Sequence, residues 1–257
     1  MRGLRGPREP VYSTLVGSAR TLSRVQGLKV TRHGTQNVPR AGGVILAANH
    51  TGYLDFAQVG LTARTAGRSV RFLMKAELER NRVVAFLMRH CGAIGVDRTH
   101  GAAAYARAVA ALRAGECVCI YPEATISRSF EIKELKSGAA RMALEAQVPI
   151  VPVAIWGEQR LWSKGVPRAL GRHHVPVHVV VGAPLGPEGS PDELTARLRT
   201  VMEDALAQAQ AGYEHPPGAP WVPARLGGGA PTPEEAAVIE ATVRARRGSG
   251  GEQAGPL

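Results

Sequence analysis

Hydrophobic and polar positions along the chain follow two alternating periods. Short apolar runs rich in β-branched residues, each bounded by Gly or Pro, are typical of strands. They are separated by stretches with helical spacing of the apolar positions. The expected strands lie at 28–34, 42–50, 69–75, 93–98, 116–123, 148–157 and 175–182, and the expected helices at 55–64, 83–91, 102–115, 137–147 and 190–208. This order predicts an α/β fold: a single domain with a mixed, largely parallel sheet flanked by helices and preceded by an N-terminal helical segment.

The two ends of the chain have different patterns. In 10–26, Val11, Leu15 and Leu22 share one helical face, with Arg20 and Arg24 beside it. Such a helix can pack on the core or lie on anionic lipid, and the sequence leaves both open. Beyond Gly212 the chain is rich in Pro and Gly, which predicts a mobile tail with one helix at 232–247. We therefore expect a basic amphipathic helical segment at 1–28, an α/β domain at 29–211 and a disordered tail at 212–257.

Composition narrows the class of partner. The 257 residues carry a formal charge of +11, which favours nucleic acid, a phospholipid surface or a phosphorylated substrate. Aromatic residues make up only 5%, and no nucleic-acid-binding motif is present, so we expect no nucleic acid partner. No window reaches the roughly 18 to 20 apolar residues of a membrane-spanning helix. We expect a protein of the cytoplasmic side that contacts an anionic membrane surface without crossing it.

The residues that could take part in catalysis lie where the expected strands end. His50 follows the strand "GGVILAAN", and Asp55 lies in the early part of the next helix. A turn through Thr51 and Gly52 would bring the Asp55 carboxylate to the imidazole, fixing its tautomer and leaving the other ring nitrogen as a proton acceptor. The alternative makes His50 a capping residue and Asp55 a solvated acid at a helix start.

Two further strand ends carry charged residues. Arg98 ends "GAIGVDR", where its guanidinium would suit a phosphate, and Glu123 in "YPEATIS" could accept a hydrogen bond from a hydroxyl. His173, His174 and His178 have no carboxylate at ligand spacing, so we expect no metal.

These segments, taken in order, resemble the PlsC-type glycerophospholipid acyltransferases, the lysophosphatidate acyltransferase family. Its blocks run NHxxxxD, G-x-I-x-V-D-R, F-P-E-G-T-R-S and V-P-I-V-P-V. The matching segments are "NHTGYLD" at 49–55, "GAIGVDR" at 92–98, "YPEATIS" at 121–127 and "VPIVPVAI" at 148–155. The resemblance covers roughly residues 30 to 185.

The resemblance implies transfer of a fatty acyl group from a thioester, acyl-CoA or acyl carrier protein, to a hydroxyl of a lysophospholipid. His50 would be the general base and Asp55 the residue that orients it. Lys75 and Arg98 would hold the acceptor phosphate. Glu123, with the turn after it formed by Ala124 and Thr125, would bind the glycerol. No cofactor is implied beyond the acyl donor, which is a co-substrate.

The third block departs from the family pattern. Ala124 stands where the family has Gly, and Ile126 stands where it has the Arg assigned to phosphate contact. Arg128, two residues on, is a candidate substitute. A lysophosphatidic acid acceptor is the first expectation, and a different head group stays open. The rival classes are a non-catalytic lipid-binding protein and a thioesterase that uses the same base on water.

Overall fold

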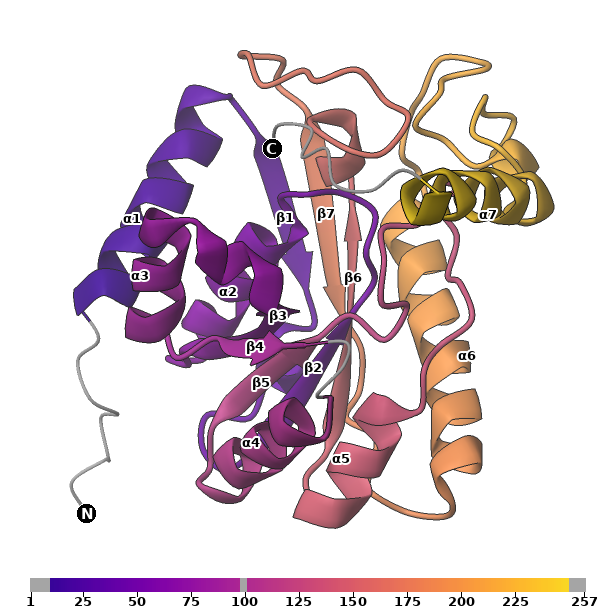
Figure 1. Cartoon of the computed structure of the whole chain (residues 1–257). Helices are drawn as coiled ribbons and strands as arrows, with labels where there is room; N and C mark the ends of the chain where they lie inside the picture. The colour runs from indigo at the N-terminus through magenta and orange to yellow at the C-terminus, as the bar shows by residue number, and fades with distance from the viewer. Residues whose placement is uncertain (1–9, 98–100, 250–257) are drawn as a thin grey trace.

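A seven-stranded sheet forms the centre of the molecule in the computed structural model, which describes residues 10–97 and 101–249 (Figure 1). The strand order is β1-β7-β6-β2-β5-β3-β4. The strands are β1 (Lys29–His33), β2 (Val44–Ala48), β3 (Val70–Lys75), β4 (Ile94–Val96), β5 (Cys117–Ile120), β6 (Ile150–Trp156) and β7 (Pro176–Val181).

Only one pair of neighbouring strands, β6 and β7, runs antiparallel. The mixed, largely parallel sheet expected from the sequence is therefore confirmed. Because β2 to β6 all run in one direction, their carboxyl ends meet at the same edge of the sheet. Ligands of open α/β sheets usually bind at such an edge.

Helices cover both faces of the sheet (Figure 1). One group comprises α1 (Pro10–Val25), α2 (Asp55–Thr65) and α3 (Arg82–His90); the other comprises α4 (Gly101–Arg113), α5 (Gly138–Ala146) and α6 (Pro191–Gln210), and α7 (Pro233–Ser249) follows near one end of α6. Short 3-10 helices lie at Thr35–Asn37, Ala76–Arg80, Glu158–Arg160 and Ala224–Leu226. No helix in 10–97 or 101–249 is both long and apolar enough to span a membrane.

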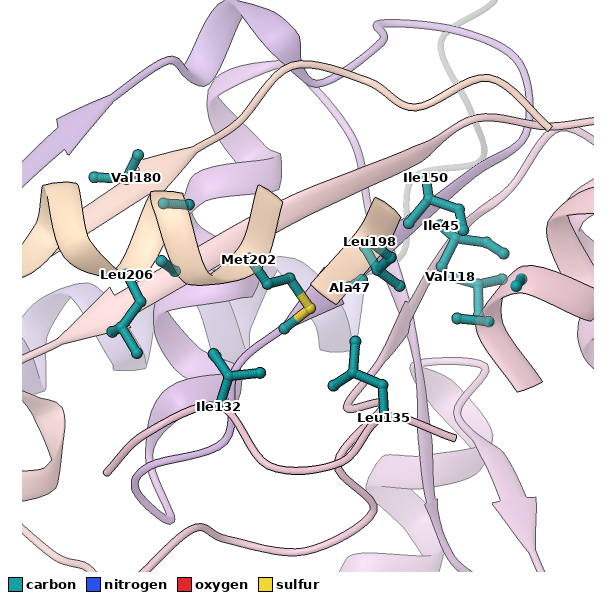
Figure 2. Packing of buried hydrophobic residues seen from close by; sticks show 14 of the residues in the cluster. Ile45, Ala47, Val118, Ile132, Leu135, Ile150, Val180, Leu198, Met202 and Leu206 are labelled. Carbon is teal, nitrogen blue, oxygen red and sulfur yellow. The ribbon is translucent and has the colours of Figure 1, made fainter. Parts of the chain in front are cut away.

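The core divides according to the two-residue period of the strands. Ile45 and Ala47 of β2 face α4, α5 and α6, whereas Val44, Leu46 and Ala48 face the α2 side. Figure 2 shows the first cluster, where the α6 side chains pack onto the sheet. Both faces of β2 are fully buried, which explains why its sequence is an unbroken apolar run.

Strand β6 contains a proline although it lies between two neighbours. Pro149 and Pro152 predicted an irregular or edge strand. In the structure, regular pairing with β7 begins only at Val153, and an isolated bridge from Ile150 to Leu185 replaces it earlier. The strand is therefore internal and irregular, and the Pro152 ring lies against Gly182, which has no side chain to obstruct it.

The N-terminal helix packs on the rest of the molecule. Tyr12 of α1 is buried, and its hydroxyl oxygen accepts a hydrogen bond of 3.1 Å from the Val70 amide. Burial raises the pKa of Tyr12 to about 12. Leu15, Leu22 and Val25 of the same helix are exposed. The core-packing alternative thus describes one side of α1, and a lipid-facing role for the other side stays a prediction.

The C-terminal segment corrects the prediction of a mobile tail. Tyr213, Trp221 and Val222 are buried in the same cluster as α4, α5 and α6, and the guanidinium of Arg160 lies 4.3 Å from the centre of the Trp221 ring. A few large aromatic side chains supply apolar surface that a count of Pro and Gly overlooks. The helix expected at 232–247 is present as α7.

We predict that Trp221→Ala lowers the free energy of unfolding by about 3 kcal/mol, because a large buried side chain leaves a cavity. Val238→Ala is the control, since Val238 is 67% exposed on α7 and its change should stay within about 0.5 kcal/mol. Urea denaturation of both variants measures the difference. Equal stability would mean that the segment after 212 does not belong to the folded core.

Candidate active site

Asn49 fixes the chain where β2 ends. Its side-chain amide donates to the Ile155 carbonyl at 3.0 Å, and its side-chain oxygen accepts from the Ile155 amide at 2.7 Å. The carboxamide thus continues the hydrogen bonding between β2 and β6 through a side chain. The next residue, His50, is held at the carboxyl edge of the sheet.

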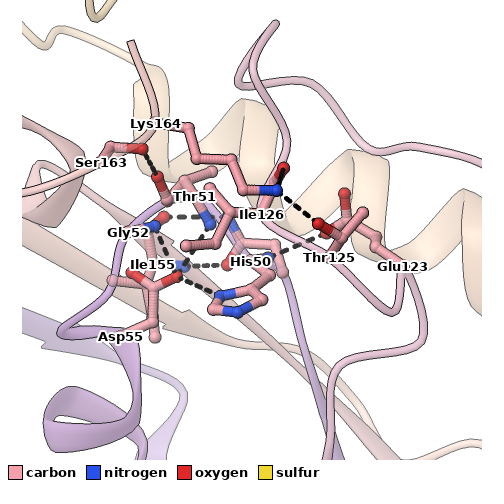
Figure 3. Close-up of polar contacts among 11 residues, drawn as sticks. His50, Thr51, Gly52, Asp55, Glu123, Thr125, Ile126, Ile155, Ser163 and Lys164 are labelled. Carbon is pink, nitrogen blue, oxygen red and sulfur yellow. Dashed lines mark hydrogen bonds and ion pairs between the residues drawn. The ribbon is translucent and has the colours of Figure 1, made fainter. Parts of the chain in front are cut away.

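The side chains of His50 and Asp55 meet in the structure, as one of the two interpretations of their spacing requires. Asp55 begins α2, is fully buried, and places Oδ2 3.1 Å from Nδ1 of His50. The same oxygen accepts hydrogen bonds of 2.8 Å from the amides of Thr51 and Gly52 (Figure 3). Asp55 is therefore not a solvated helix-start acid. A carboxylate at Nδ1 keeps the proton on that nitrogen and leaves the Nε2 lone pair free to accept a proton.

The main chain of His50 is held from both sides. Its amide donates to Oε1 of Glu123 at 2.9 Å, and its carbonyl accepts from the Ser127 amide at 2.8 Å. Its ring stacks on Tyr121, with ring centres 4.1 Å apart and planes inclined by 23°. The turn after β5 therefore sets both the position and the tilt of the imidazole.

Glu123 differs from its expected surroundings. Both carboxylate oxygens accept from main-chain amides, Oε1 from His50 and Oε2 from Lys133 at 3.1 Å. Burial raises the pKa of Glu123 to about 8, against the lowering effect of these two amides. In the structure this side chain braces the main chain of His50, and contact with a glycerol hydroxyl stays a prediction.

Three of the other predicted site residues, Ala124, Thr125 and Arg128, lie in the turn after β5. Ala124 is exposed and has a left-handed backbone, with φ at 59°. The Thr125 hydroxyl faces Lys164, and Arg128 is partly buried. Lys75 is exposed at the carboxyl end of β3. Arg98 lies outside the described residues, so its predicted contact with phosphate stays a prediction.

A loop after β6 contacts the turn at residues 51–53 directly. The Trp162 carbonyl accepts from the Tyr53 amide at 3.0 Å, and the Ser163 hydroxyl donates to the Thr51 carbonyl. Lys164 then reaches the turn after β5, where its Nζ lies 2.5 Å from the Thr125 hydroxyl oxygen. This loop therefore connects the two turns that surround His50.

Sequence reasoning missed Asn49, Ser163 and Lys164. Asn49 had a signal, because it immediately precedes His50 in the motif. Ser163 and Lys164 had none, since their role depends on how the loop after β6 folds back across the sheet edge. In the described part of the chain, no three His, Cys, Asp or Glu side chains gather as metal ligands.

Comparison with known proteins places the chain in a family. The family model described as "Acyltransferase" matches residues 29–156. A 1-acyl-sn-glycerol-3-phosphate acyltransferase of Bacillus subtilis is 30% identical over 148 residues, which cover 56% of this chain and 71% of that protein. A probable 1-acyl-sn-glycerol-3-phosphate acyltransferase of Mycoplasma pneumoniae is 30% identical over 175 residues, 63% of this chain and 64% of that one. The match thus spans just under two thirds of the Mycoplasma protein.

A solved structure shares the fold. The crystal structure of the 1-acyl-sn-glycerophosphate (LPA) acyltransferase PlsC from Thermotoga maritima superposes with a TM-score of 0.66 at 22% identity, over 84% of this chain and 86% of that chain. The sequence matches, rather than the shared fold, relate the chain to the O-acyltransferases. The chain belongs to the acyltransferase family that includes the PlsC-type 1-acyl-sn-glycerol-3-phosphate acyltransferases, which confirms the resemblance found from its motifs.

We predict that Ala124→Gly raises the free energy of unfolding by about 0.5 to 1 kcal/mol. A left-handed backbone costs an alanine about 1 to 2 kcal/mol, and the greater freedom of glycine in the unfolded chain offsets part of the gain. Ala106→Gly, at an exposed position inside α4, is the control and should instead lose about 1 kcal/mol. Thermal and urea denaturation test the signs; a loss at both positions would contradict the left-handed turn.

Proposed function

We propose that this protein transfers a fatty acyl group from acyl-CoA or acyl carrier protein to a hydroxyl of a lysophospholipid, with 1-acyl-glycerol-3-phosphate as acceptor and phosphatidic acid as product. The observation that supports it most is the buried Asp55 oxygen that faces Nδ1 of His50. The similarity to 1-acyl-sn-glycerol-3-phosphate acyltransferases of Bacillus subtilis and Mycoplasma pneumoniae supports the choice of acceptor.

His50 acts as the general base in the proposed mechanism. Nε2 takes the proton of the acceptor hydroxyl while the hydroxyl oxygen attacks the thioester carbon, and Asp55 stabilises the imidazolium that forms. The C–O bond then forms and the C–S bond breaks. The imidazolium returns the proton to the leaving thiolate, so the enzyme ends in its starting state.

No acyl-enzyme is needed, because the thioester is already activated and the acceptor attacks it directly. Two serines in the turn after β5 support this simpler route. Ser127 and Ser129 are buried, and their hydroxyl oxygens lie 3.2 Å apart, each within hydrogen-bond reach of the other. Neither is hydrogen-bonded to the His50 ring in the way that a serine nucleophile is to its base.

Substitution of the dyad tests the mechanism. His50→Ala should lower kcat/KM for acyl transfer at least about 100-fold, the usual contribution of a general base, and Asp55→Asn should lower kcat while the KM for the acceptor changes little. His90→Ala, which removes an exposed histidine of α3, serves as control and should keep full activity. The assay follows radiolabelled acyl-CoA with a panel of lysophospholipids.

The same assay separates the rival functions. Release of CoA without esterified lipid would indicate a thioesterase. Lipid binding without any turnover of wild type would indicate a non-catalytic lipid-binding protein. Equal ester formation by wild type and His50→Ala would remove the general base from the mechanism.

The proposed enzyme works as a peripheral protein on the cytoplasmic face of the membrane. Leu22 and Val25 of α1 are 49% and 64% exposed. Beside them, Arg20, Arg24 and Arg32 line a pocket of about 320 Å³ between α1, β1 and α2. Burial lowers the pKa of Arg32, and the neighbouring Arg20 lowers it further. Exposed apolar side chains beside clustered arginines suit an anionic lipid surface.

Charge removal on α1 tests membrane binding. The double variant Arg20→Gln/Arg24→Gln should bind phosphatidylglycerol vesicles roughly 10-fold to 30-fold more weakly, since each basic residue near the surface contributes about 1 kcal/mol. Arg197→Gln/Arg199→Gln on exposed positions of α6 changes the net charge equally and should have a much smaller effect. Equal sedimentation of both double variants with vesicles would return α1 to a purely structural role.

A further inference from the structure

The turn after β5 lacks the cation that its family pattern carries, and a lysine from another part of the chain occupies its neighbourhood. Ile126 is buried and apolar. Lys164, which is 38 residues further along the chain, lies with Nζ 2.5 Å from the Thr125 hydroxyl oxygen and 3.4 Å from the Ile126 carbonyl oxygen (Figure 3). A positive charge is thus restored at this turn by a different residue.

Positive charges outnumber negative ones around Lys164. Burial, together with the charges of Arg128, Lys133 and Lys75, lowers the pKa of Lys164 to about 8. The carboxylate of Glu240 on α7 raises the pKa of Lys164. Its Oε2 lies 2.5 Å from Nζ of Lys133, so this carboxylate is shared with a second cation. Gathering like charges in a partly buried place is unfavourable unless an anion binds there.

A pocket opens at the same place. It has a volume of about 400 Å³, within the range of small-molecule sites, and its lining includes Arg128, Lys164 and Gly165. The C-terminal segment supplies further lining residues, including Ala230, Glu235 and Ile239. The Glu235 carboxylate is engaged at the start of α7, where it accepts from the Thr232 amide at 2.9 Å. Arg128 Nε is buried and has no hydrogen-bond acceptor within 10–97 and 101–249.

The pocket is fixed relative to the catalytic histidine. Lys164 contacts the backbone carbonyl of Ile126, and the next amide, that of Ser127, donates to the His50 carbonyl. From the other direction, Ser163 donates to the Thr51 carbonyl within the catalytic turn. Lys164 and the His50 main chain therefore contact the two sides of one peptide, the carbonyl of Ile126 and the amide of Ser127.

We propose that Lys164, with Arg128 beside it, binds the phosphate monoester of the acceptor in place of the arginine missing at position 126. Lys164 is then a specificity-determining residue, because it favours acceptors with a phosphate next to the glycerol. This inference rests on the proposed acyltransferase function. The ligand assigned to Lys164 is the phosphate of the acceptor, although the phosphates of CoA share the same chemistry.

Kinetics with a charged and an uncharged acceptor test the assignment. Lys164→Gln should raise the KM for lysophosphatidic acid about 10-fold to 100-fold, the loss expected for a hydrogen bond to a charged group. The KM for monoacylglycerol and for acyl-CoA should not change. Lys164→Arg keeps the charge and should retain most of the preference. Lys136→Gln is the control, since Lys136 is 66% exposed and paired with Glu134 on the surface.

A second variant moves the cation back to its family position. Ile126→Arg in the Lys164→Gln background should restore at least part of the preference for lysophosphatidic acid over monoacylglycerol. Thermal denaturation identifies a double variant that does not fold; in that case Lys164→Arg against Lys164→Gln decides. An unchanged preference in Lys164→Gln overturns the inference. A rise in the KM for acyl-CoA alone overturns it too, because the phosphate would then belong to the donor.

Failure of the proposed function gives a different result. Wild type would then form no ester with any acceptor, while calorimetric binding of lysophosphatidic acid could still be measured. Tighter binding of lysophosphatidic acid than of monoacylglycerol, lost in Lys164→Gln and kept in Lys164→Arg, would support the phosphate site without catalysis. Binding of lysophosphatidic acid that is equally tight in wild type and Lys164→Gln would overturn the phosphate site as well.

Discussion

One buried oxygen atom, Oδ2 of Asp55, holds together the turn after β2 at the carboxyl edge of the sheet. Asp55 Oδ2 receives the amides of Thr51 and Gly52 and faces Nδ1 of His50. A carboxylate without solvent is costly unless several donors surround it. The three donors at this atom stabilise the closed turn and at the same time favour the proton of His50 on Nδ1. The contacts that fold the turn are thus the ones that the proposed general base requires.

The surrounding sheet supplies the contacts that fix the main chain on which the His50 side chain is carried. Asn49 ties the end of β2 to β6, and Glu123 and Ser127 hold the His50 main chain from the turn after β5. Since these strands run parallel, their ends arrive at one edge and their turns meet there. The imidazole consequently has little freedom beyond rotation about its own side-chain bonds, which stacking on Tyr121 limits further. Such preorganisation lowers the reorganisation needed during proton transfer.

The parts of this protein predicted from the sequence are those set by local patterns. Strand and helix periods predicted the sheet and its helices. The spacing of His50 and Asp55 left a contact and a solvated acid both open, and the structure brings Asp55 Oδ2 to 3.1 Å from Nδ1 of His50. Composition misled at the C-terminus, where Trp221 and its neighbours outweigh the surrounding Pro and Gly. The position of Lys164 beside Thr125 was not predictable, since it depends on the path of a loop across two strand ends. Glu123 was found by motif, but its two amide partners come from tertiary contacts.

The dyad is encoded within a few consecutive residues, whereas the cations around the neighbouring turn come from β3, the turn after β5 and the loop after β6. The residues that hold the His50 imidazole and the cations beside it therefore lie in different segments of the sequence. The loop after β6 nevertheless contacts both, because Trp162 and Ser163 bind the turn at 51–53 and Lys164 binds Thr125. A substitution in this loop can change the cations and leave the turn intact only where the hydrogen bonds of Trp162 and Ser163 are kept.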